Sequence, residues 1–122
     1  MSSNIIDIDK CLFVPAEVVG MEAEFSKYAL YMKALSDETR VRIFDMISGG
    51  ELCACRILEE FNITQPTLSY HMKILCDSGL VNGRRDGVWM KYSINRDSLA
   101  QVRKFFDGIG ERIGEQSECC KR

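Results

Sequence analysis

Apolar residues recur with the period of a helix in two segments of this chain, one early and one late. From about 16 to 35 they recur every three or four positions, which predicts an amphipathic helix. A second stripe predicts a last helix over about 95 to 114. Its apolar members are Leu99, Val102, Phe105, Phe106, Ile109 and Ile113. The two stripes exceed the needs of one small core, so we expect a dimer interface or, alternatively, burial within the monomer.

Two helices are expected directly after the first. Ser36 or Asp37 can cap a second helix, which the glycine pair at 49 and 50 would end. A third, short helix is expected over about 53 to 61.

The connection at 62 to 64 leads to a fourth helix. Thr64 can cap it, and Pro66 falls in its first turn, where the missing N–H group costs nothing. A short helix, a tight connection and a capped second helix predict a helix-turn-helix. Apolar side chains of the fourth helix can face the core: Leu68, Met72, Ile74 and Leu75.

Polar side chains of the fourth helix are suited to DNA. Those near its outer face are Gln65, Thr67, Ser69, Tyr70 and Lys73. Such groups bind phosphates, and Gln and Lys can also read purines in the major groove. His71, the only histidine, is expected to face DNA or to pack, rather than to bind a metal.

The segment LVNGRRDGVWMKYSI predicts a β-hairpin, because Asp86 and Gly87 lie between two apolar-rich runs. A hairpin directly after a helix-turn-helix is a wing. Arg84 and Arg85 would then meet the phosphate backbone or a minor groove. An ordinary solvated hairpin tip is the alternative.

These elements predict a mainly α fold with a β-hairpin wing, a winged helix-turn-helix in the order α-α-α-α-β-β-α. With 122 residues the chain fits one domain, which we expect over 16–114. Residues 1–15 would form an N-terminal arm and 115–122 a C-terminal tail.

The formal net charge of −2 by itself argues against a nucleic-acid partner. The distribution of charge matters more than the sum. Between 68 and 92, four cations oppose two carboxylates, Asp77 and Asp86. The cations are Lys73, Arg84, Arg85 and Lys91. One face of the protein can therefore be basic, and a symmetric dimer would double it.

No apolar run approaches the roughly 20 residues that cross a bilayer, so we expect no membrane partner. The first ten residues lack both the basic and the continuous apolar part of a secretory signal, which indicates a cytoplasmic protein. In a reducing cytoplasm, the six cysteines suggest ligands or reactive thiols rather than disulfides.

Four segments together carry a family resemblance. They are LSDETRVRIFDMI at 35–47, ELCACRILEEF at 51–61, QPTLSYHMKIL at 65–75 and SGLVNGRRDGVWMKYSI at 78–94. In combination they resemble the ArsR/SmtB family of winged-helix metalloregulators, in particular its arsenical-responsive repressors. The resemblance implies a homodimer joined through the first and last helices. It also implies that the apo protein binds double-stranded operator DNA and dissociates when an inducer binds.

Arsenite sensors of this kind carry ELCVCDLC where this chain reads ELCACRIL. Cys53 and Cys55 match the first two cysteines, whereas Leu58 stands in the place of the third. The resemblance thus implies trivalent arsenic or antimony, As(III) or Sb(III), as the inducer, with one thiolate still to be found. Residues i and i+2 lie about 200° apart around an intact helix. Ligation by both cysteines should then unwind or bend the first turn of the third helix and shift the fourth.

Three cysteines are candidates for the missing ligand. Cys11 ranks first, because some cadmium- and lead-responsive members of the family bring cysteines of the arm to the third helix of the partner subunit. Cys119 and Cys120 are substitutes, or else an idle tail. Two thiolates would suffice for a trivalent organoarsenical, whose third valence is taken by carbon. Cys76 is expected to be a small buried hydrophobe.

Other functions compete with arsenic sensing. The same fold could serve a thiol-redox or persulfide-sensing repressor, or a cadmium or lead sensor. An enzyme with a cysteine nucleophile and His71 as base is disfavoured, because no orienting carboxylate motif or glycine-rich phosphate loop is found. A single histidine also leaves no His-rich site of the kind that zinc-responsive relatives use.

Overall fold

The computed structural model describes residues 16–114, with side chains from residue 24 onward. Its elements in chain order are α2 (Ala16–Ala34), α3 (Glu38–Met46), the 3-10 helix η1 (Ile47–Gly49), β1 (Leu52–Cys53), α4 (Ala54–Glu59), α5 (Gln65–Ser78), β2 (Val81–Asp86), β3 (Trp89–Ile94) and α6 (Arg96–Arg112). The predicted winged helix-turn-helix is confirmed. The sequence had not indicated η1 and β1.

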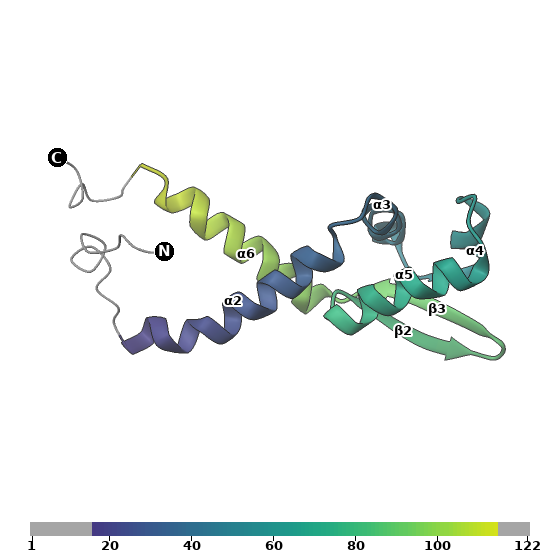
Figure 1. Cartoon of the computed structure of the whole chain (residues 1–122), viewed down its shortest axis with the longest axis horizontal. Coiled ribbons are helices and arrows are strands. Elements are labelled where there is room, and N and C mark those ends of the chain that lie inside the picture. The colour runs from purple at the N-terminus through teal and green to yellow at the C-terminus, as the bar shows by residue number, and fades with distance from the viewer. Residues whose placement is uncertain (1–15, 115–122) are drawn as a thin grey trace, which may run out of the picture.

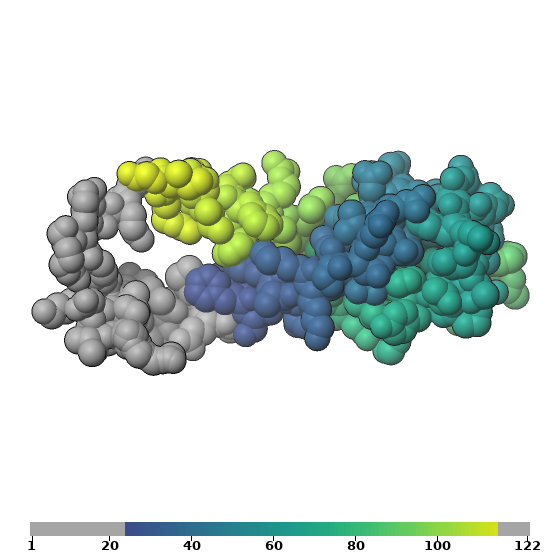
Figure 2. Space-filling model, turned by 45° about the horizontal axis from the view of Figure 1, so that its top comes forward, coloured from purple at the N-terminus to yellow at the C-terminus, as the bar shows by residue number. Residues whose placement is uncertain are grey.

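The body of the molecule and its two long helices lie at opposite ends (Figure 1). Helices α3, α4 and α5 gather beside the hairpin of β2 and β3, whereas α2 and α6 extend away from them toward the two termini. The space-filling view shows the same elongated outline, with the wing and the helix-turn-helix at one end (Figure 2). None of the helices within residues 16–114 is long and apolar enough to cross a membrane.

Local side-chain caps explain where the helices begin. Of the two predicted caps of α3, Asp37 is the one used, because its side chain accepts a hydrogen bond from the N–H of Arg40. Thr64 caps α5 in the same way, through the N–H of Thr67 at 3.3 Å. Gly79 ends α5 in the left-handed region, with φ +94°, which glycine adopts without strain.

The hairpin is closed by Gly87 and Val88, because Asp86 still pairs with Trp89. Gly87 has φ +67°, as the first position of a tight II′ hairpin turn requires. On its other side, β3 also pairs with β1, so the sheet has three strands in the order β1-β3-β2. Cys53 lies opposite Lys91 in this added strand pair.

The third helix begins later than predicted. Cys53 has φ −72° and ψ 146°, an extended conformation, and it is the N-cap of α4 rather than a residue within the helix. The reason is tertiary: the backbone of Cys53 pairs with β3, a segment far along the chain.

Buried apolar side chains join the end of α2 to α3, η1, α4, α5 and the sheet. They are Tyr31, Ala34, Ile43, Ile47, Ile57, Leu68, Met72, Leu75, Leu80, Val81 and Tyr92. Three of the four predicted core positions of α5 are buried, and the fourth, Ile74, is half-buried. This core holds α5, the second helix of the helix-turn-helix and hereafter the recognition helix, against the rest of the body.

Helices α2 and α6 leave much of their apolar surface uncovered. They touch where the rings of Tyr28 and Phe105 lie 4.6 Å apart. Large apolar side chains of both helices, and that of Ile113 just after α6, are nevertheless between 38% and 75% exposed. These are Phe25, Leu30, Met32, Phe106, Ile109 and Ile113. The alternative that both stripes are buried within the monomer is therefore wrong for these residues.

Candidate thiol and DNA-binding sites

The thiols of Cys53 and Cys55 converge at the start of α4. Their Sγ atoms are 2.6 Å apart, and both cysteines are free and half-buried. They converge because Cys53 precedes the helix, so the 200° separation of an i, i+2 pair within a helix does not apply. The premise that both sulfurs can meet only if the first turn of this helix is distorted is therefore wrong.

The two thiols differ in acidity. The two thiols share a hydrogen bond in which either sulfur could donate. Because Cys53 Sγ already accepts a hydrogen bond from the Cys55 backbone N–H at 3.3 Å, we assign Cys53 as the acceptor and the Cys55 thiol as the donor. The bond from the Cys55 thiol, more than any other cause, lowers the pKa of Cys53 against the opposing effect of burial. Donating that proton raises the pKa of Cys55. Cys53 is thus the readier thiolate, the form that binds metals and attacks electrophiles.

A third ligand is not found beside this pair in the part of the chain that the structure describes. No group of three or more His, Cys, Asp or Glu side chains within it could hold a metal ion. The three predicted candidates, Cys11, Cys119 and Cys120, lie outside the described residues. Cys76 packs against the core, and burial raises the pKa of its thiol, as befits a small hydrophobe rather than a ligand.

The recognition helix presents the expected polar face. All of the outer-face residues predicted for DNA contact are exposed: Gln65, Thr67, Ser69, Tyr70 and Lys73. Lys73 also forms an exposed ion pair with Asp77 at 2.9 Å. Such a pair is weak, so Lys73 can exchange it for a phosphate.

His71 lies on the opposite side of α5 and is only 9% exposed. The Arg40 guanidinium donates to its Nδ1 atom at 3.1 Å, and Arg40 Nε donates to the carbonyl oxygen of Ala34 at 2.7 Å. This geometry favours packing over DNA contact for His71. No local pattern of residues indicated this role of Arg40, because its two partners come from other helices.

The two arginines of the wing differ in their ion pairing. Arg84 donates two hydrogen bonds of 2.7 Å each to the carboxylate of Glu51, and this pairing lowers the pKa of Glu51. Arg85 is exposed and makes no ion pair with any of the described residues. Arg85 is therefore the freer of the two for a phosphate, whereas Arg84 ties the wing to the segment just before Cys53.

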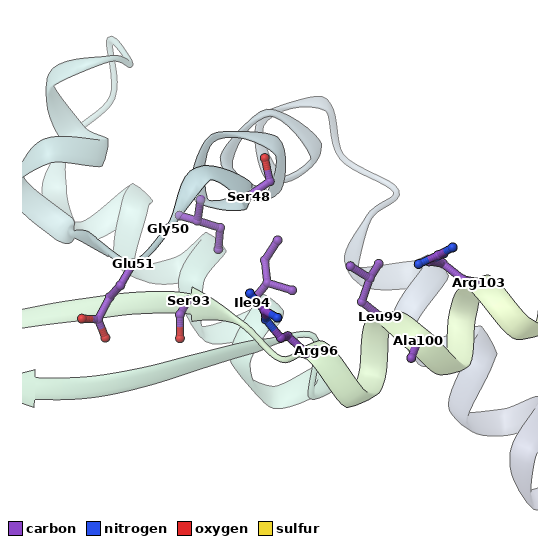
Figure 3. Close-up of a pocket in the computed structure, with 10 residues that line it drawn as sticks. Ser48, Gly50, Glu51, Ser93, Ile94, Arg96, Leu99, Ala100 and Arg103 are labelled. Atoms are coloured by element: carbon purple, nitrogen blue, oxygen red, sulfur yellow. The ribbon is translucent and has the colours of Figure 1, made fainter.

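A separate groove of about 480 Å³ lies between η1, the end of β3 and the start of α6 (Figure 3). Ser48, Glu51, Arg96, Leu99 and Arg103 are among its lining residues. It contains no cysteine, so it is not a candidate site for a thiophilic ion.

Comparison with known proteins now identifies the family. The family model described as bacterial regulatory protein, arsR family, matches residues 37–83. The arsenical resistance operon repressor of Staphylococcus xylosus is 40% identical over 97 residues, which cover 80% of this chain and 91% of that protein. The chain belongs to the ArsR family. ArsR-family proteins are DNA-binding transcriptional regulators, so this chain is a transcriptional repressor and not an enzyme.

Solved structures agree with the ArsR fold. The crystal structure of an ArsR-family transcriptional regulator matches with TM-score 0.69 and 20% identity, over 75% of this chain and 95% of that one. A homodimeric winged helix-turn-helix domain of a possible ArsR-family regulator from Mycobacterium bovis, solved by NMR, matches with TM-score 0.61 and 24% identity. It covers 80% of this chain and 91% of that one. At these identities the likeness shows the fold alone.

Proposed function

We propose that this repressor responds to trivalent arsenic or antimony. It binds operator DNA in the apo form and leaves it when Cys53 and Cys55 bind the inducer. The observation that carries the proposal is the pair of free thiols, 2.6 Å apart, at the start of the first helix of the helix-turn-helix. Thiolates select soft elements, and trivalent arsenic and antimony are soft. The resistance repressor of Staphylococcus xylosus supports the same inducer class.

Operator binding would use α5 and the wing. The exposed side chains of α5 named above would enter the major groove, and Arg85 would contact a phosphate. We propose a cytoplasmic homodimer through α2 and α6, whose uncovered apolar side chains support such an interface. Its two α5 helices would reach half-sites about 34 Å apart, one turn of DNA.

Release would be transmitted through the sheet rather than by unwinding α4. Cys53 pairs with Lys91 of β3, and Glu51, two residues earlier, holds Arg84 of β2. A shift of Cys53 on ligation would thus disturb both strands of the wing. It would also move α4, whose Ile57 shares the core with Leu68 of α5.

The third thiolate for inorganic arsenic would be Cys11, with Cys119 or Cys120 as substitutes. These residues could come from the same or the partner subunit. X-ray absorption of the reduced protein with one equivalent of arsenite tests the assignment. We expect three sulfur atoms around arsenic, falling to two in Cys11→Ser, with the double change at Cys119 and Cys120 as the comparison.

Cys53→Ser and Cys55→Ser should each bind operator DNA as the native protein does, yet no longer release it with arsenite. Gel-shift titration with and without arsenite measures both properties. A variant that cannot bind DNA would contradict this division of roles. Release by peroxide without any arsenical would favour the redox sensor instead.

A further inference from the structure

An apolar pocket of about 290 Å³ opens directly beside the thiol pair. Cys55 itself lines it, together with four apolar residues: Ala54, Leu58, Leu68 and Trp89. Glu59 and Gln65 complete the lining. The pocket is bounded by α4, the first turns of α5 and the first residue of β3. It therefore touches Cys55, the recognition helix and the wing at once.

Leu58 places apolar atoms at the position where the family motif has its third cysteine ligand. It lies three residues after Cys55 on α4, so the two side chains are neighbours on one face of the helix. A substituent on an atom held by Cys53 and Cys55 can thus reach the pocket. The hydroxyl group of arsenite would gain nothing from these apolar walls, because a polar group loses water there without a matching partner.

We infer that the inducer is a trivalent organoarsenical with one aryl group, whose arsenic binds Cys53 and Cys55 and whose ring occupies this pocket. The inference rests on the proposed function, because it needs both thiols as arsenic ligands. Starting from an arylarsonous acid, R–As(OH)₂, two As–S bonds replace two As–O bonds. The two thiol protons leave with the two hydroxyl groups as water, and no electrons are transferred.

The size of the pocket agrees with an aromatic ring. A cavity of about 150 Å³ lined by apolar side chains is large enough for benzene. A phenyl group therefore fits within about 290 Å³, whereas a methyl group would leave most of the pocket unfilled. The indole of Trp89 can meet the ring in an offset or edge-to-face arrangement.

Fluorescence titration of the full-length reduced protein tests the inference, because Trp89 is the only tryptophan in the chain. The probes are phenylarsine oxide, methylarsonous acid and arsenite. Each affinity is divided by that of the same probe for a free dithiol, which removes the intrinsic strength of its As–S bonds. We expect the normalised affinity for the phenyl probe to exceed that for the methyl probe by at least about tenfold. Trp89 emission should change with saturation at one equivalent per subunit.

Two substitutions at one position test the pocket itself. Leu58→Phe fills it and should remove the phenyl preference while methylarsonous acid binding stays within about twofold. Leu58→Ala leaves it open and should keep the preference. Leu99→Phe makes the same change in the separate groove of Figure 3 and is the matched control. Thermal melting and operator binding of each apo variant verify that it is folded.

The outcomes separate this inference from the proposed function. Equal normalised affinities for the three probes, unchanged in Leu58→Phe, would overturn the aryl pocket. The proposed function would still stand if Cys53→Ser and Cys55→Ser abolish arsenite binding. All three arsenicals binding normally to both serine variants would overturn both. Replacing Cys11, Cys119 and Cys120 together by Ser should not weaken phenylarsine oxide binding, because carbon fills the third valence.

Discussion

Cys53 combines three structural and chemical roles. It ends β1, caps α4 and offers the more acidic thiol of the pair. These roles are linked, because the extended backbone of a cap turns the side chain toward the first N–H groups of the helix. The same turn brings Sγ to Cys55. A change of ligation at this sulfur therefore acts on a strand and a helix together.

The acidity difference predicts an order of alkylation. The pKa of Cys53 is lowered and that of Cys55 raised, so as the pH falls Cys55 should lose reactivity first and Cys53 last. Peptide mass spectrometry after brief iodoacetamide treatment over a pH series measures this. Identical pH profiles for the two cysteines would refute the hydrogen-bond assignment.

Removing a single cation from the DNA-binding face should change how strongly operator affinity depends on salt. Arg85→Ala should weaken operator binding and reduce the slope of log K against log salt by about 2, since the proposed homodimer loses one phosphate contact in each subunit. Lys73→Ala should do the same. Arg84→Ala is the comparison, and its slope should change less, because Glu51 already neutralises Arg84. A slope unaffected in Arg85→Ala would mean that the wing does not reach the backbone.

At the scale of elements, a buried polar contact fixes the recognition helix. Arg40 on α3 reaches back to the last residue of α2 and across to His71 on α5. Three helices are thus joined by one side chain that is itself only 9% exposed. The orientation of α5 depends on this contact as well as on apolar packing.

His71→Leu should lower the free energy of unfolding by about 1–3 kcal/mol, because a buried N–H of Arg40 loses its acceptor. Urea denaturation followed by circular dichroism gives the value. Ser69→Ala, an exposed change on the same helix, should stay within about 0.5 kcal/mol. Equal stability of the two variants would show that Arg40 finds another partner.

At the scale of the whole molecule, the elements proposed to bind DNA lie apart from the surface proposed to form the dimer. The body with α5 and the wing lies at one end, and the uncovered apolar faces of α2 and α6 lie at the other (Figure 1). Exposed apolar surface of this kind marks an interaction site. Pairing there would leave both recognition helices free for DNA.

Phe106→Glu should shift the protein toward monomer, because a charge would enter the proposed dimer interface. Sedimentation equilibrium measures the assembly, and operator affinity should fall with it. Val41→Glu introduces the same charge at an exposed site on α3 and should leave assembly unchanged. A dimeric Phe106→Glu protein would place the interface elsewhere.

The sequence by itself determined the presence of the α-helices and the hairpin and the cap of α5, and it narrowed the cap of α3 to Ser36 or Asp37. Asp37 and Thr64 act on N–H groups three residues ahead, and Gly87 shapes its own turn, so the interactions are local and visible as patterns. Only the tertiary structure decided where Cys53 lies, which arginine of the wing is free, and that His71 is buried. Each of these depends on a partner far along the chain: Lys91 for Cys53, Glu51 for Arg84, and Arg40 for His71. Such pairings arise only when separate segments pack together, and no local spacing encodes them.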